Sequence, residues 1–433
     1  MQTDAYALHK FSLYVTLALL AALPGIAMRL GGLHAPPVIA ACAFGAAILG
    51  AGFLLSWGAE AAEEHMSQGL AIAVLALVTI LPEYAVDVYF TLQAGRHPGS
   101  DYVQFAAANM TGANRLLIGV AWPLVVLLTW WKSGKRAITL RPDNAVEVVF
   151  LTLATLYSFV ITLRGSITLF DMVILIGIYG AYLWRVSKLP KNEEDEDEEE
   201  SEVGPAAALE TLPKARQWAI MAALTLVAAL IILAVAQPFA ESLLAAGQAL
   251  GVNKFVLIQW MAPLAGEAPE VVLTVLFVLN LRPTAALGAL ISDKINQWTL
   301  LVGMIPLFYS LAAGRTLAFP LSARQHEEFF LTAAQSLFAV ALLLRLRLSL
   351  PSALVLLTLF GVQLGVDFVY RHNEPKAIQF LAAMAWLYLA FALLLFAWSF
   401  RSLLRFGKMG LFPGDAETQE ERTDREIGEE SNG

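Results

Sequence analysis

The 433-residue chain is dominated by apolar side chains: 58% are hydrophobic, only 15% are charged, and the mean hydropathy is +0.65. These values exclude an ordinary soluble domain and predict a polytopic membrane protein in a lipid bilayer. A single cysteine, Cys42, excludes a disulfide framework and cysteine-based metal or haem motifs.

Apolar runs of about 20 residues, the length of a helix that crosses a ~30 Å hydrocarbon core, follow one another along the chain. About twelve such runs predict an all-α protein with about 12 transmembrane helices. The first run is not followed by a convincing cleavage pattern, so we expect it to remain as a span. The runs centre near Leu20, Gly45, Leu75, Ala121, Leu153, Ile176, Leu226, Val272, Val302, Val340, Leu359 and Leu389.

An acidic segment, KNEEDEDEEESE, begins at Lys191 between the sixth and seventh runs. It is too charged to enter a bilayer or a packed core, which predicts a solvated linker. The chain after Phe412 is also acidic. An even number of spans places both blocks on one side, and the excess of Lys and Arg in the loops of that side predicts that both termini are cytoplasmic. The alternative of a calcium-responsive linker lacks the spaced ligands of an EF-hand.

Two runs carry a Pro-Glu pair in apolar surroundings, in LVTILPEYAVD around Glu83 and MAPLAGEAPEVVL around Glu270. A carboxylate at the bilayer centre costs about 2.5 kcal/mol or more, so these two are expected to face a cavity or a partner. The preceding proline lacks an N–H, which is expected to free the carbonyls near Val78 and Ala265. Freed carbonyls and carboxylates together predict an oxygen-rich cation site.

The two halves of the chain resemble each other when Glu83 is aligned with Glu270. A second polar helix follows in each half, AANMTGANRLLIGVAW around Asn114 and GALISDKINQWTLLVG around Asp293. Each half then holds five spans, and an odd-numbered repeat must return inverted, as in secondary transporters. The expected organisation is an extra helix (1–34), a first repeat (35–187), the acidic linker (188–215), a second repeat (216–371), an extra helix (372–408) and an acidic disordered tail (409–433).

Helical spacing indicates which groups can meet. Thr79, Glu83 and Asp87 follow one another at i, i+4, and Glu267 and Glu270 lie at i, i+3, so each set shares one helix face. Calcium prefers six to eight oxygen ligands, several of them carboxylates. With no Cys or His in these helices, soft transition metals are less suited. The candidate metal ligands are Glu83, Glu270, Glu267 and Asp293, supported by Thr79 and Asn114.

These segments resemble the paired α-repeats of the calcium/cation antiporter superfamily. Its sodium/calcium exchanger branch carries Gly-Thr-Ser-Leu-Pro-Glu on one helix and Gly-Ser-Asn-Ile-Phe-Asn on the next. The resemblance implies a ten-helix exchanger core between Gly45 and Leu359, with Glu83 and Glu270 as shared acidic ligands. The matching stretches are Val78 to Glu83, Ala265 to Glu270, Gly112 to Leu117 and Ser292 to Gln297.

The chain departs from the family motif at several positions. The serine two residues before each proline is replaced by Ile80 and by Glu267. The motif's Ser and final Asn, which help to hold sodium in the family, align with Ala113 and Leu117 in the first half and with Asp293 and Gln297 in the second. Two basic residues, Arg115 and Lys294, are gained beside these positions.

These departures make sodium less secure as the coupling ion. We expect Lys294, Arg115, Gln297 and Asp87 to serve as coupling or charge-compensating groups. Lys294 is hypothesised to take the electrostatic role of a bound sodium ion. Asp87 is the least certain of the four, because it lies one turn beyond Glu83, toward the aqueous mouth of the site.

The expected function is secondary active antiport, in which calcium or a related cation is exchanged for sodium or protons by alternating access. The chain is expected to be no enzyme and to need no cofactor; it lacks the GxxxxGK[ST] phosphate loop of an ATP-driven pump. One alternative is a proton-coupled monovalent cation exchanger. Another is a transport-inactive scaffold or sensor in which the acids pair with Arg115 and Lys294. For Asn114 and Gln297, interhelical hydrogen bonding is an alternative to ligation. The expected partners are inorganic cations and the lipid bilayer, with no nucleic acid. Short loops favour a prokaryotic inner membrane.

Overall fold

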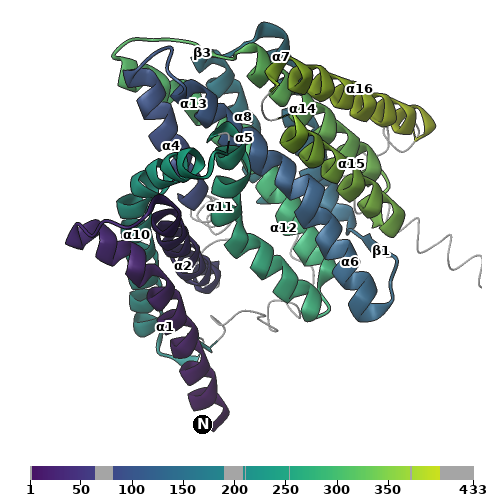
Figure 1. The fold of residues 1–433 in the computed structure, drawn as a ribbon. Coiled ribbons are helices and arrows are strands. Elements are labelled where there is room, and N and C mark those ends of the chain that lie inside the picture. Colours follow the sequence, from purple (N-terminus) through teal and green to yellow (C-terminus); the bar gives the residue numbers. More distant parts are fainter. Residues whose placement is uncertain are drawn as a thin grey trace, which may run out of the picture.

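The protein is a bundle of long helices in its computed structural model, which describes residues 2–63, 81–189, 208–209, 211–252, 254–370 and 373–399 (Figure 1). Ten helical segments in these ranges are long and apolar enough to cross a membrane. The expectation of an all-α polytopic membrane protein is therefore confirmed. The acidic segment 191–202 and the tail 409–433 lie outside the described residues.

The first half contains the helices and strands that surround Glu83. Two α-helices join through a π-helical segment, η1, into one span, because the chain continues without a turn between them. The elements are α1 (Gln2–Gly31), α2 (Pro37–Glu63), α4 (Leu81–Arg96), α5 (Tyr102–Leu116), η1 (Leu117–Ala121), α6 (Trp122–Ser133), β1 (Ala137–Thr139), η2 (Pro142–Asn144), α7 (Ala145–Arg164), β2 (Ser166–Ile167) and α8 (Leu169–Val186).

The second half repeats this order. A π-helical segment, η4, again joins two helices into one span. The elements are α10 (Lys214–Leu250), α11 (Lys254–Leu279), α12 (Pro283–Asn296), η4 (Gln297–Leu301), α13 (Val302–Ala313), β3 (Phe319–Pro320), α14 (Ala323–Leu343), β4 (Arg347–Ser349), α15 (Leu350–Val369) and α16 (Glu374–Trp398).

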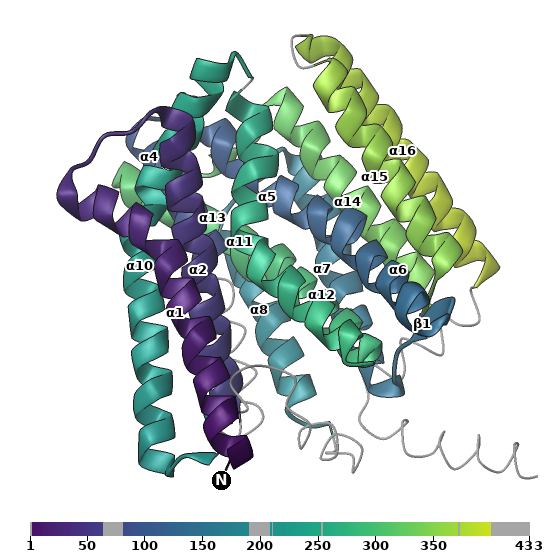
Figure 2. The ribbon, with the colours of Figure 1, turned by 60° about the horizontal axis from the view of Figure 1, so that its bottom comes forward.

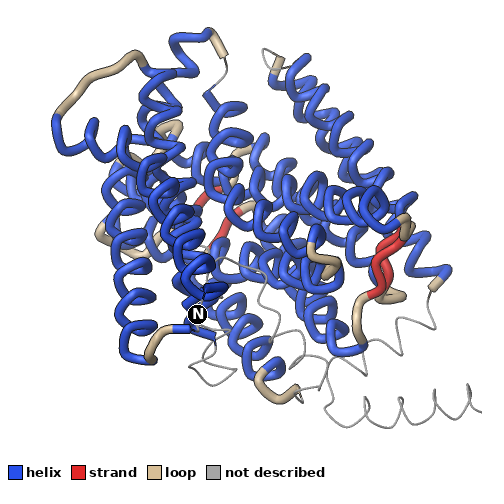
Figure 3. Tube along the Cα trace, turned by 90° about the horizontal axis from the view of Figure 1, so that it is seen from below, coloured by secondary structure: helices blue, strands red, loops and turns tan. Residues whose placement is uncertain are grey.

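Two short antiparallel strand pairs show how the halves are related. β1 pairs with β4, with Ile138 opposite Leu348, and β2 pairs with β3, with Ile167 opposite Phe319. β1 precedes α7 and β2 follows it, just as β3 precedes α14 and β4 follows it in the second half. If the two halves are exchanged, the pair of β1 with β4 therefore becomes the pair of β3 with β2. The two pairs lie at separate places on the bundle (Figure 3). This arrangement is what an inverted repeat requires.

Glycines allow the central helices to approach closely. A Cβ added to Gly112 of α5 would lie 1.8 Å from the carbonyl oxygen of Gln259 in α11, so only glycine fits there. A Cβ on Gly52 of α2 would lie 2.5 Å from the Pro269 ring. Small residues serve this purpose at helix interfaces in membranes. Helices α1, α2 and α10 lie on one side of these central helices and α14, α15 and α16 on the other (Figure 2).

Two of the twelve expected runs are not among these ten apolar segments. The run near Val340 corresponds to α14, a helix of 21 residues that is not among the ten apolar segments, because Glu328, Gln325 and Gln335 lower its hydropathy. The run near Leu75 lies largely outside the described residues. Helix α11 continues through both Pro263 and Pro269, each of which removes one backbone donor without ending the helix.

Candidate cation-binding site

Four carboxyl groups meet where α4, α11 and α12 come together. Oxygen atoms of Glu267, Glu270 and Asp293 lie within 4.8 Å of one another. Glu83 lies next to Glu267, and Asp293 lies next to both Glu267 and Glu270, close enough for each pair to share a hydrogen bond when one carboxyl group is protonated. A hydrogen bond between two carboxyl groups needs a proton on one of them. The arrangement can therefore hold protons as well as a cation.

The repeat motif places these acids. Glu83 is in the first turn of α4, directly after Pro82, and Gly266 of α11 faces it, since a Cβ added to Gly266 would lie 3.5 Å from the Glu83 Cα. The two Pro-Glu segments thus lie against each other, although Glu83 and Glu270 are 187 positions apart in the sequence. The structure brings together all four acids that the sequence singled out as ligands.

Several acid oxygens in the described residues have no hydrogen-bond partner although they are buried. Burial of an unpaired polar atom costs free energy, so such atoms mark places where a ligand or water binds. Oxygen atoms with two lone pairs each, held among carboxylates, suit a hard cation such as calcium. The unpaired atoms are Glu83 Oε1, Asp87 Oδ2, Glu267 Oε2 and Asp293 Oδ2.

Amide side chains orient two of the acids. Gln297 donates a hydrogen bond of 2.8 Å from Nε2 to Glu267 Oε1, and Asn109 donates one of 2.8 Å from Nδ2 to Asp87 Oδ1. Asp87 is fully buried, which corrects its expected placement toward the aqueous mouth: α13 and α5 both pack against α4 and cover this turn. Gln297 thus contacts the site as a hydrogen-bond donor.

Lys294 is fully buried and its ammonium is held by the opposite repeat. Its Nζ donates hydrogen bonds of 2.7 Å to the main-chain oxygen and 2.5 Å to the side-chain oxygen of Asn114. The ammonium also lies over the Trp298 ring, 5.3 Å from its centroid. Because the amide oxygen of Asn114 accepts this bond, it is engaged by Lys294 in this structure.

Arg115 lies in a different cluster from the four acids. Its guanidinium forms an ion pair with Glu328 of α14 at 2.5 Å, and both side chains are buried. Arg324 approaches the same carboxylate at 3.5 Å, and Asp367 of α15 interacts electrostatically with all three. We call Arg115, Arg324, Glu328 and Asp367 the α5–α14–α15 cluster. This cluster was not predicted from the sequence, because its members lie on three helices that are distant in the chain.

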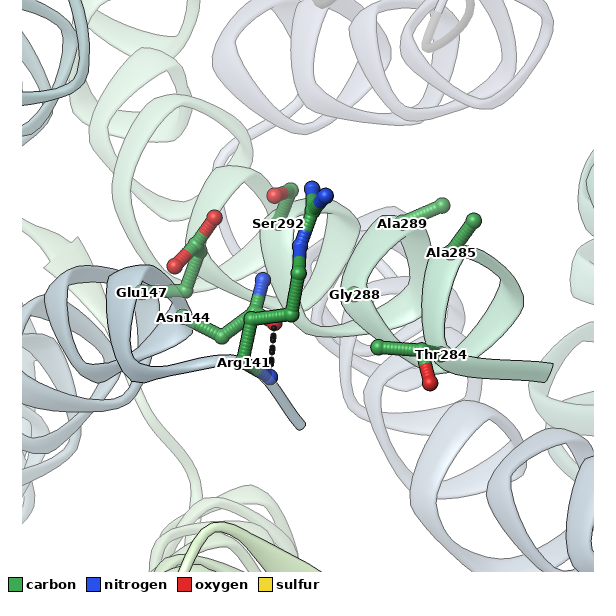
Figure 4. A pocket seen from close by; sticks show the side chains of 8 residues that line it. All are labelled: Arg141, Asn144, Glu147, Thr284, Ala285, Gly288, Ala289 and Ser292. Atoms are coloured by element: carbon green, nitrogen blue, oxygen red, sulfur yellow. Dashed lines mark hydrogen bonds between the residues drawn. The ribbon is translucent and has the colours of Figure 1, made fainter. Parts of the chain in front are cut away.

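A pocket of about 220 Å³ opens beside the site, between the start of α7 and one face of α12 (Figure 4). The Glu147 carboxylate lies in it, and Glu147 Oε2 is buried with no hydrogen-bond partner among the described residues. Ser292, the neighbour of Asp293, lines its inner end and is hydrogen-bonded to the Tyr182 hydroxyl at 2.9 Å. The lining residues are Arg141, Asn144, Glu147, Thr284, Ala285, Gly288, Ala289 and Ser292.

Sequence reasoning missed two features near the acids. The hydroxyls of Tyr84 and Tyr179 are buried without a hydrogen-bond partner in the described residues, and both interact electrostatically with Asp293. The position of Tyr84 directly after Glu83 was the one available signal, although it does not distinguish a packing tyrosine from a polar contact. Thr79, the remaining candidate ligand, lies outside the described residues.

The chain matches one known protein family over both of its repeats. The model of the family described as "Sodium/calcium exchanger protein" matches residues 36–188 and 220–369. A crystal structure of the H+/Ca2+ exchanger CAX is similar over 92% of this chain and 98% of that chain, with 36% identity and a TM-score of 0.83. A search of curated protein sequences finds no match.

Two more distant structures share the fold. The sodium-calcium exchanger NCX_Mj is 13% identical, with a TM-score of 0.52, over 81% of this chain and 98% of that chain. The Ca2+/H+ antiporter protein YfkE is 11% identical, with a TM-score of 0.55, over 81% of this chain and 99% of that chain. At such identities the likeness concerns the arrangement of helices alone.

Proposed function

Because this chain belongs to the sodium/calcium exchanger family and is a cation antiporter of that family, we propose that it exchanges calcium ions for protons. The observation that carries this proposal is the close set of four acids, Glu83, Glu267, Glu270 and Asp293, in which oxygen atoms of the last three lie within 4.8 Å of one another. The similarity to a structure of an H+/Ca2+ exchanger supports the choice of ions.

The chemistry of exchange follows from charge balance. Four ionised carboxylates close together repel one another strongly, and one ammonium, that of Lys294, offsets only part of this charge. A calcium ion or protons can supply the remainder, so the two compete for the same oxygens. We propose Glu83 and Glu270 as ligands shared by both repeats, with Glu267 and Asp293 completing the set. Each bound calcium ion then displaces protons from these acids.

The remaining candidates take supporting places. We propose that Gln297 orients Glu267 toward the ion and that Asp87 adds negative charge behind Glu83. Asn114 is proposed to contribute through its contact with Lys294, and Thr79 through its position one turn before Glu83.

Access to the site is proposed to alternate between the two sides of the membrane. The pocket beside Ser292 lies near β1 and the start of α7, where the basic loops predict the cytoplasmic side. Its position next to Asp293 suits a path between the cytoplasm and the acids. With the other loops short, we place the protein in a prokaryotic inner membrane with both termini in the cytoplasm.

Flux measurements on purified protein in lipid vesicles test the proposal. We expect radioactive calcium to accumulate when an outward-directed proton gradient is imposed and to stop when an ionophore collapses that gradient. Calcium should also raise the thermal midpoint of the detergent-purified protein more than magnesium or potassium does, because a bound ion stabilises the folded state by mass action.

Two results would contradict the proposal and identify its alternatives. Proton flux driven by potassium or sodium without any calcium flux would indicate a monovalent cation exchanger. No flux of any cation, from a preparation with a normal thermal transition, would indicate an inactive scaffold or sensor.

A further inference from the structure

Lys294 and Asn114 occupy equivalent positions in the two repeats. Each lies three residues before the π-helical segment of its own half, which begins at Leu117 or Gln297. Despite their separation in sequence they touch, since the Lys294 ammonium donates to two oxygens of Asn114. The contact therefore joins the repeats at the point where their equivalent helices, α5 and α12, come together.

The surroundings of the ammonium are those of a small monovalent cation. Two oxygen atoms lie at 2.7 and 2.5 Å from Nζ, and the side chain is fully shielded from solvent. The ammonium interacts electrostatically with Asp293, Glu267 and Glu83, three of the four site acids. Burial of a charged ammonium in a membrane is costly, and the attraction of these carboxylates offsets part of that cost.

We propose that the Lys294 ammonium is a built-in monovalent cation of this exchanger, which stands beside the acids in place of a sodium ion. This inference rests on the proposed function and sharpens it: sodium is excluded from the site, so protons are the ions exchanged for calcium. Lys294 is then a specificity-determining residue for the counter-ion. Its ammonium is attached to the chain, so that, unlike a bound sodium ion, it is not released during transport.

A purely structural role for Lys294 makes a different prediction. If its only task were to bridge α12 and α5, an uncharged side chain of similar length would weaken the bundle, and no variant would respond to sodium. If the ammonium stands in for an ion, a shorter side chain with an oxygen atom leaves room for sodium among the same oxygens. The response to sodium therefore separates the two roles.

The test compares the parent with Lys294→Asn, Lys294→Met and Lys294→Arg in vesicles. Calcium uptake is measured with an outward-directed sodium gradient at symmetric pH and, separately, with an outward-directed proton gradient without sodium. We expect the parent and Lys294→Arg to respond to protons alone. Calcium uptake by Lys294→Asn should be about tenfold faster with a sodium gradient than with choline in place of sodium. A tenfold ratio corresponds to about 1.4 kcal/mol. Lys294→Met, whose side chain fills the space without an oxygen atom, should not gain it.

Binding measurements keep the test independent of transport. Thermal midpoints are compared in sodium chloride and choline chloride at equal ionic strength, and a sodium-specific rise is expected for Lys294→Asn but not for the parent. Sodium-driven uptake or sodium-specific stabilisation in the parent would overturn the inference even if the Asn variant did not fold. A folded Lys294→Asn without any sodium response would overturn it as well. Absence of all calcium flux in the parent would contradict the proposed function instead.

Discussion

The membrane interior of this protein holds two buried charged clusters that differ in their balance of charge. The cation site contains Glu83, Glu267, Glu270 and Asp293 for a single ammonium, that of Lys294. The α5–α14–α15 cluster contains two guanidinium groups and two carboxylates. A set with equal numbers of acids and bases is formally neutral, whereas a set with excess carboxylates needs ions or protons to balance its charge. We therefore propose that the first cluster binds the transported ions and that the second stabilises the fold.

Neighbouring residues on α5 belong to different clusters. Asn114 faces Lys294 and the acid site, while Arg115, the next residue, reaches Glu328 and stacks on Trp260 at 5.0 Å from the ring centroid. Successive residues of an α-helix point about 100° apart, so one turn can serve two sites. A basic residue that follows a ligand in the sequence therefore does not have to lie near the bound ion.

The largest expected effect is the loss of transport in Glu83→Gln and in Glu270→Gln. An amide keeps the shape of the side chain but removes the charge that attracts calcium and the carboxylate that takes up a proton. We expect uptake to fall by about 100-fold or more, an activation or binding loss of about 2.7 kcal/mol. The assay is proton-driven calcium uptake into vesicles.

A matched control for these variants is Glu241→Gln, which changes an exposed acid of α10 that accepts a hydrogen bond from Tyr89. It should transport at a rate close to that of the parent. If both site variants kept their uptake, the assignment of the acid-rich cluster as the cation site would be wrong.

The second prediction concerns the balanced cluster. Glu328→Gln removes the partner of Arg115 and leaves a buried charge uncompensated, which costs about 3–5 kcal/mol in other proteins. We expect a lower thermal midpoint with little change in uptake per folded molecule. The double variant Arg115→Leu with Glu328→Leu should recover much of the stability, because it removes both charges at once.

One result for Glu328→Gln would contradict the structural role of its cluster. If Glu328→Gln left the thermal transition unchanged but abolished calcium uptake, the α5–α14–α15 cluster would belong to the transport pathway. The distinction between a cluster that binds ions and a cluster that stabilises helices would then fail.

The sequence was sufficient to predict the membrane class and the meeting of the acids. Apolar runs of the right length and a repeated Pro-Glu pair depend on local composition and on spacing along one helix, which are visible without a structure. The ligand roles of Glu83 and Glu270 remain predictions. The continuous path of α11 through Pro269 was not predicted, because tertiary packing decides whether proline ends a helix.

Other features depend on contacts between distant helices and could not be predicted. The bond from Lys294 to Asn114, the pairing of Arg115 with Glu328 and the burial of Asp87 all depend on how helices rotate against each other. The π-helical segments also lack a sequence signal, since each extra residue is accommodated by packing. They occur at functional sites in many proteins, and here each follows the polar helix of its repeat.

The third prediction sharpens the contrast within the site. Gln297→Leu removes the donor that holds Glu267 Oε1 at 2.8 Å. Hydrogen bonds to charged groups contribute about 1.5–3 kcal/mol, so we expect the half-saturating calcium concentration to rise about tenfold. Gln363→Leu is the matched control, because this buried amide of α15 has no hydrogen-bond partner among the described residues. An unchanged calcium affinity in Gln297→Leu would show that Glu267 needs no such orientation.

The smallest effect is expected in the pocket, where Glu147 lies outside both clusters. Its carboxylate is buried near Arg141 and adds negative potential along the path to Ser292 and Asp293. Glu147→Gln should slow calcium uptake about twofold to fivefold at low ionic strength and less at high salt, because steering of an ion is screened over about 10 Å at 0.1 M salt. Calcium affinity should stay unchanged, since Glu147 is not among the linked acids. Asp143→Asn, one turn earlier and outside the pocket lining, controls for a general change in surface charge. A large loss of calcium affinity in Glu147→Gln would show that this carboxylate of α7 binds the ion itself and does not only line the access path.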